Sequence, residues 1–169
     1  MIPAFLTVLA VTTSDPPPYA NALSVQLASF FSTGVTLQYE RQVVRRLSIV
    51  NSLSYRVSGG DELDTREMGG GLEGRFWFLG HGMLGPYAGV RFDYSFTRVW
   101  EESGDRFLGS AMSYAQSLVG GVRVILWHRV ELTPSYGIGI RQEIDPRGRL
   151  EPLVHVDLFR LGMTAGVMF

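Results

Sequence analysis

The sequence predicts an all-β fold, an antiparallel up-and-down barrel of eight strands, and three observations lead to this prediction. Apolar and polar residues alternate with a period of two over most of the chain after Tyr19, as in strands with one apolar face. Turn signals and charged loops divide this pattern into eight segments. Between the rims, nearly all charged residues keep to one parity of the segments, and no amphipathic helical pattern persists beyond a turn or two.

The predicted strands cover residues 20–31, 35–42, 47–57, 66–78, 87–100, 107–126, 130–143 and 153–169. The fifth has the clearest alternation, with Phe92 and Tyr94 on one face and Arg91 and Asp93 on the other. The connections alternate in character. Those near residues 43–46, 80–82 and 127–129 are tight or apolar, and those near 59–64, 101–105 and 145–148 are charged loops. An even strand count places the first and the last residue of the barrel domain on the same side as the tight turns.

The last segment ends on an alternating run whose apolar members are Leu161, Met163, Ala165, Val167 and Phe169. Such an apolar edge strand would promote aggregation in a soluble protein. In a membrane barrel the last strand pairs with the first, and its apolar face contacts lipid. Val154 and Val156 have the opposite parity to Leu161, so we expect a β-bulge near Leu158.

The polar parity carries seven carboxylates and six arginines, which we expect to fill the lumen. This set consists of Glu40, Arg56, Glu67, Glu73, Arg75, Arg91, Asp93, Arg123, Glu131, Arg141, Glu143, Asp157 and Arg160. An eight-stranded barrel has room inside only for side chains, and the glycines on this face leave space for long ones. Charges of both signs offset the cost of burying each other. The sequence therefore predicts an eight-stranded antiparallel up-and-down transmembrane β-barrel.

Composition limits the possible functions. The chain is 46% hydrophobic, yet no stretch reaches the roughly 18 apolar residues that a membrane helix needs. A net charge of −1 gives no general attraction to nucleic acid. The absence of cysteine excludes disulfides and thiolate metal sites, and we expect no cofactor. Residues 1–19 are interpreted as a probable signal-peptide remnant with a Pro-rich leader, and residues 20–169 as the barrel domain.

With this strand count, the alternating faces and the run that ends at Phe169, the chain resembles the small eight-stranded outer-membrane proteins of Gram-negative bacteria. The transmembrane domain of outer-membrane protein A and the opacity-like surface proteins are examples. The resemblance covers residues 20–169. It implies insertion by the barrel assembly machinery, with the terminal run as the signal, and a monomer surrounded by outer-membrane lipid. The chain departs from the outer-membrane protein A type, for which a soluble domain after the barrel is expected.

We therefore expect a non-enzymatic outer-membrane protein with a structural or surface role and a lumen filled by an Arg–carboxylate network. A narrow ion or solute pore is the first alternative. A lipid-modifying enzyme is less favoured, since only His155 with Asp157 offers a general base beside a carboxylate. His81 and His128 lie in predicted turns. A soluble lipocalin-like binder would require the two faces to be inverted.

Overall fold

The computed structural model describes residues 19–27, 33–59, 63–79, 82–101, 107–144 and 153–169, and these form an all-β structure. The side chains of residues 63, 101 and 153–160 are outside the described part, as are residues 1–18, where the signal segment is predicted. Within the described ranges, no helix is long and apolar enough to span a membrane. The strands are β1 (Asn21–Gln26), β2 (Gly34–Val44), β3 (Leu47–Gly59), β4 (Leu63–Trp77), β5 (Gly85–Glu101), β6 (Phe107–Leu126), β7 (Val130–Ile144) and β8 (Leu153–Met168).

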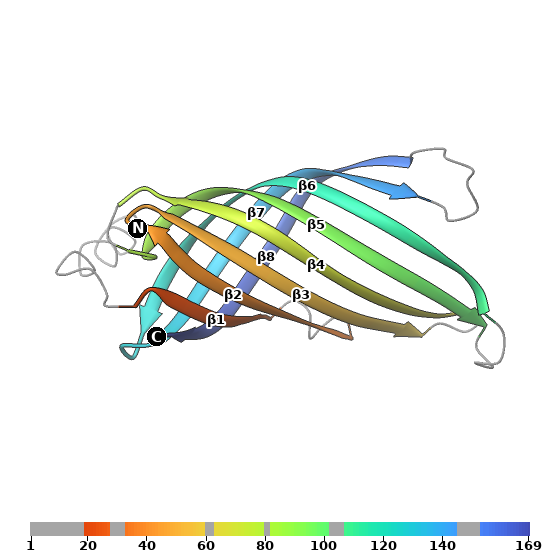
Figure 1. Cartoon of the computed structure of the whole chain (residues 1–169), viewed down its shortest axis with the longest axis horizontal. Coiled ribbons are helices and arrows are strands. Elements are labelled where there is room, and N and C mark those ends of the chain that lie inside the picture. Colours follow the sequence, from red (N-terminus) through yellow and green to blue (C-terminus); the bar gives the residue numbers. More distant parts are fainter. Residues whose placement is uncertain (1–18, 28–32, 60–62, 80–81, 102–106, 145–152) are drawn as a thin grey trace, which may run out of the picture.

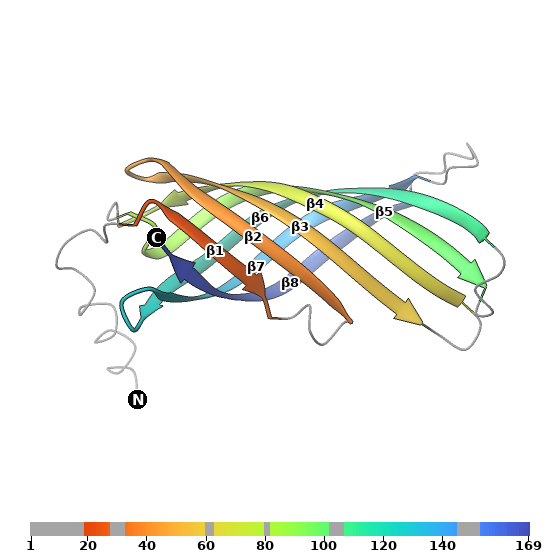
Figure 2. The ribbon, with the colours of Figure 1, turned by 60° about the horizontal axis from the view of Figure 1, so that its bottom comes forward.

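The eight strands form a closed barrel in which each strand pairs with the next in the sequence and β8 pairs with β1 (Figure 1). All pairs are antiparallel. The β1–β8 seam faces forward in Figure 2, and at its end Asn21 and Phe169 exchange two backbone hydrogen bonds of 3.0 and 2.9 Å. The predicted fold class of an eight-stranded antiparallel up-and-down barrel is confirmed.

The two ends of the barrel differ. The turn end carries the short β2–β3, β4–β5 and β6–β7 connections, the start of β1 and the end of β8 (Figure 1). The loop end is the opposite one, toward which the β1–β2, β3–β4, β5–β6 and β7–β8 connections lie. In the β6–β7 turn, Trp127 and His128 have positive φ angles of 45° and 67°, which is unusual for residues other than glycine.

The bulge predicted near Leu158 is present in the backbone. Gly137 of β7 pairs with Arg160, whereas Gly139 pairs with Asp157, so β8 holds one more residue than β7 over this interval. The extra residue changes the parity of β8 between its first and second halves. The bulge therefore allows the apolar run from Leu161 to continue on the face predicted for it.

The outward face of the barrel is apolar. Phe92 is 51% exposed, Tyr94 58% and Ile138 47%, and all three alternate with inward residues of much lower exposure. The apolar members of the terminal run also face outward. The inverted arrangement, with these side chains at the protein centre, is therefore not what the structure shows. Asn51 and Pro134 lie on the outward face as well.

The buried apolar core of the described residues is small and lies inside the turn end. Besides Val50 and Leu84, its members are Ala22, Trp77, Met83, Tyr87 and Met168, and these five form one cluster. Met83 belongs to the β4–β5 connection, which folds back into the barrel between Gly82 and Gly85, two glycines with φ of 66° and 84°. Residues with a side chain rarely adopt these backbone φ values, so glycine at both positions permits the fold-back. We call these five residues the apolar cap.

Candidate functional site: the charged lumen

A compact ion-pair cluster lies next to the apolar cap. Glu40 of β2 is its centre, because Oε2 accepts hydrogen bonds from Arg75 Nη1 at 2.7 Å and from Arg123 Nη2 at 2.5 Å. Ser48 donates a further hydrogen bond to Oε1. Glu73 Oε1 lies 2.5 Å from Arg75 Nε, and the Glu131 carboxylate pairs with the Arg123 guanidinium. We call Glu40, Glu73, Arg75, Arg123 and Glu131 the inner cluster.

The inner cluster draws its members from β2, β4, β6 and β7, so it bridges the lumen. Its side chains are almost completely enclosed: Arg123 is 1% exposed and Glu131 0%. Three carboxylates face two guanidiniums at bonding distance. Charge-assisted hydrogen bonds of this kind are about twice as strong as neutral ones, and they offset the cost of burying the charges.

Aromatic rings of the apolar cap also contact the two arginines of the inner cluster. The Arg75 guanidinium carbon lies 4.6 Å from the Tyr87 ring centroid, and that of Arg123 lies 5.1 Å from the Trp77 centroid. The two rings contact each other at 4.9 Å between centroids. Trp77 Nε1 also donates a 2.9 Å hydrogen bond to Ser48 Oγ. Cation–π contacts are strongest where water is excluded, as it is here.

Arg91 of β5 connects the inner cluster with the middle of the lumen. Its Nε donates to both carboxylate oxygens of Asp93, at 2.8 and 2.9 Å. Its Nη1 lies 3.8 Å from Glu73 of the inner cluster. On the same level, the Asp93 carboxylate occupies the space that a side chain at Gly71 would fill. Glycine at position 71 therefore makes room for this second layer of charge.

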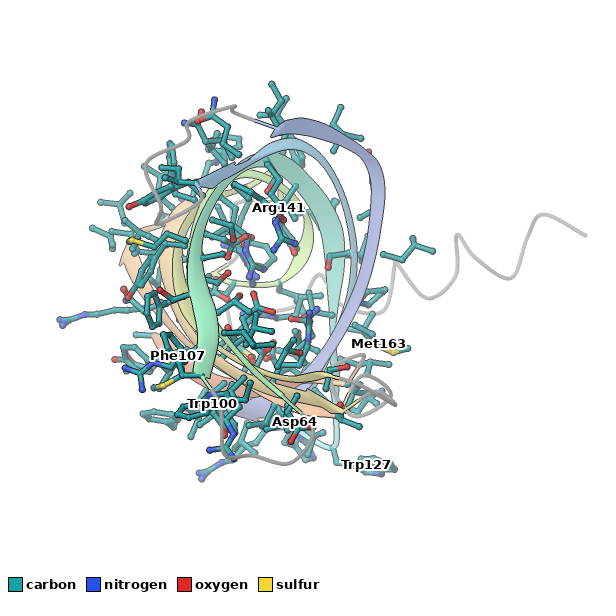
Figure 3. The ribbon with its side chains drawn as sticks, turned by 90° about the vertical axis from the view of Figure 1, so that its right-hand side faces the viewer. Asp64, Trp100, Phe107, Trp127, Arg141 and Met163 are labelled. Carbon is teal, nitrogen blue, oxygen red and sulfur yellow. The ribbon has the colours of Figure 1, made fainter. Side chains whose placement is uncertain are left out.

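The loop end of the lumen is open by comparison. It holds a cavity of about 260 Å³ lined by Arg56, Thr65, Glu67, Thr97, Ala111, Met112, Ser113, Arg141 and Glu143. Arg56 and Glu67 pair at 3.4 Å, and Arg141 and Glu143 at 3.3 Å. The view along the barrel from this end shows Arg141 inside the ring of strands and Phe107 and Met163 outside it (Figure 3). We call this space the outer cavity.

The structure places the predicted lumen residues whose side chains it describes on the inner face, but in separate layers. Glu40, Glu73, Arg75, Arg123 and Glu131 form the inner cluster, Arg91 and Asp93 the middle layer, and Arg56, Glu67, Arg141 and Glu143 line the outer cavity. The side chains of His155, Asp157 and Arg160 are outside the described part, so the general-base hypothesis stays a prediction.

Sequence reasoning missed the uncharged members of the site. Trp77, Tyr87, Ser48 and Thr133 touch the inner cluster, and Met83 closes the space beneath it. Trp77, Tyr87 and Thr133 have the parity of the charged residues, which is a signal that could have identified them. Met83 gives no such signal, because it lies in a connection and not in a strand.

The described residues contain no group of three or more His, Asp or Glu side chains that could hold a metal ion. The inner cluster can hold charge in fixed positions and block passage along the lumen. The outer cavity can admit a small polar molecule. Comparison of the chain with family models, curated proteins and solved structures gave no match.

Proposed function

We propose that this chain is a non-enzymatic outer-membrane β-barrel protein with a structural or surface role, and that its lumen is closed at the turn end. The observation that carries the proposal is the direction of the two faces. Large apolar side chains cover the outside, and ion pairs occupy the inside. Exposed apolar surface on this scale would make a soluble barrel aggregate, whereas in a bilayer it contacts acyl chains.

Strand length supports the membrane setting. β2–β8 have 11 to 20 residues each, and a tilted strand needs about 9–11 to cross the hydrocarbon layer. The short turns, the start of β1 and the end of β8 all lie at the same end of the barrel. Membrane barrels whose short turns face the periplasm have this arrangement. The alternating run from Leu161 in β8 to Phe169, the residue after β8, is then the signal read by the assembly machinery.

The closed lumen rests on two layers at the turn end. The apolar cap fills the barrel at the level of Trp77 and Met83, and the inner cluster crosses it directly above. Both layers are built from several strands. Moving a single connection aside would therefore not open a path through the lumen. A narrow pore would need an open path through both the apolar cap and the inner cluster.

Extraction tests the membrane setting. The full chain is expressed in a Gram-negative host, and the membrane fraction is washed with carbonate and then extracted with detergent. We expect the protein in the detergent extract, with faster gel migration before heating than after it, because a folded barrel resists the detergent until heated. Recovery in the aqueous fraction without detergent would refute the proposal.

Planar-bilayer recording tests the closed lumen. We expect little steady conductance from the wild type, and a measurable one from the double variant Met83→Ala with Arg123→Ala, which removes one side chain from each layer. Met163→Ala with Arg141→Ala is the matched control, since it removes the same side-chain types from the outward face and the outer cavity. A large stable channel in the wild type would favour the pore alternative.

A further inference from the structure

The outer cavity has the features of a binding site that the closed-barrel role does not use. Two oppositely charged pairs line it from different parts of the wall: Arg56 of β3 with Glu67 of β4, and Arg141 with Glu143 of β7. The strands β5 and β6 lie between them in the barrel order and contribute Thr97 and Ser113 to the lining. The two pairs therefore line one polar space from separate strands.

These pairs differ from those of the inner cluster in a way that matters for ligands. Their shortest N–O distances are 3.3 and 3.4 Å, against 2.7 Å or less in the inner cluster. Their side chains are 24% to 48% exposed. Exposed pairs of this length contribute little to stability, so an incoming charge can replace one partner of a pair at small cost.

Arg141 is already oriented toward the cavity by its neighbours. Its Nη2 donates a 3.3 Å hydrogen bond to Ser113 Oγ, and Ser113 in turn is bonded to Ser95 at 2.7 Å. A guanidinium held in this way offers its remaining donors to a carboxylate in a fixed direction. Such preorganisation lowers the entropy cost of binding.

The charge balance selects the ligand class. The lining holds two guanidiniums and two carboxylates, so a simple anion would meet the glutamates and a simple cation the arginines. A molecule with one carboxylate and one ammonium group can satisfy both signs at once. The described lining has no aromatic ring on which a sugar or base could stack, and a volume of about 260 Å³ suits a molecule of amino-acid size.

We propose that the outer cavity binds a small zwitterion that carries a carboxylate and an ammonium group, with the carboxylate on Arg141 and the ammonium on Glu67 of the opposite pair. The barrel wall alone forms this site, so the inference does not depend on whether the lumen conducts.

Isothermal titration calorimetry on the full chain in detergent tests the proposal. The probes are unbranched ω-amino acids from glycine to 6-aminohexanoate, together with the acid and the amine of each matching length. We expect one chain length to bind best, because it spans the separation of the two pairs. The acid or amine alone should bind at least about tenfold more weakly, since one charge-assisted hydrogen bond is lost.

The variants Arg141→Gln and Glu67→Gln, which each remove one of the two charged groups that hold the ligand, should each weaken that binding at least about tenfold. Arg98→Gln is the matched control, because Arg98 follows the lining residue Thr97 in β5 but faces outward. Heat-dependent gel migration verifies that each variant is folded. The proposal is wrong if no probe gives a saturable heat, if the acids or the amines bind as tightly as the amino acids, or if Arg98→Gln weakens binding as much as Arg141→Gln.

Discussion

The turn end and the loop end of the same lumen use the same two side-chain types in opposite ways. At the turn end, Arg123 is enclosed, and one carboxylate, Glu40, bridges it to Arg75 at bonding distance. At the loop end, Arg141 and Glu143 form a single longer contact beside a cavity. An Arg–Glu pair is thus not a fixed unit of stability. Its contribution depends on how completely the surrounding wall excludes water.

Removing the central carboxylate is the strongest test of this difference. Glu40→Gln replaces the carboxylate that accepts from both Arg75 and Arg123, so two buried charge-assisted hydrogen bonds are lost or weakened, and we expect the free energy of unfolding to fall by about 3–5 kcal/mol. Glu143→Gln is the matched change at the loop end and should cost less than about 1 kcal/mol, because its pair is exposed. Urea unfolding in detergent, followed by tryptophan fluorescence, measures both. Equal losses would remove the distinction between the two ends.

Replacing a tryptophan at each end tests how far the aromatic contacts matter. Trp77→Phe removes the hydrogen bond to Ser48 and part of the ring under Arg123, so we expect a loss of about 2 kcal/mol in the free energy of unfolding. Trp100, which packs on Phe107 at 5.3 Å between centroids, is the control at the loop end. Trp100→Phe should cost less than half as much in the same urea series. A larger loss of unfolding free energy at Trp100 would contradict the interpretation that the apolar cap and the inner cluster stabilise the barrel more than the loop end does.

The smallest expected effect concerns Arg56. Its side chain is about half exposed and contacts Glu67 at 3.4 Å, so Arg56→Gln should change the free energy of unfolding by less than about 0.5 kcal/mol. The same urea unfolding series, repeated at low and high salt, measures this value and its screening. A loss above about 2 kcal/mol would show that the outer cavity is part of the structural core.

Much of the barrel could be predicted from local pattern. The strand at 107–126 was predicted with the bounds that the structure has, and the bulge near Leu158 followed from one change of parity. The faces of Phe92 and Arg91 followed from alternation alone. These features are local, because successive side chains of a strand point to opposite faces whatever the partner strand is.

The depth of each charge could not be predicted in the same way. Arg123 and Glu40 are 83 residues apart, and their contact depends on the register of β2–β3 through β5–β6 and on the tilt of all the strands between them. Parity places both residues inside the barrel but gives neither their level nor their partner. The inner cluster, the middle layer and the outer cavity therefore appear as one charged set in the sequence.

By itself, the sequence determined the strand number, the inward and outward faces and the charge balance of the lumen, because each follows from side-chain alternation and composition. Only the tertiary structure decided that Met83 packs into the apolar cap, that Glu40 bridges two arginines, and that Arg56 and Arg141 line an open cavity. The physical reason is that water exclusion depends on which distant strands meet at each level, and a local pattern does not contain that information.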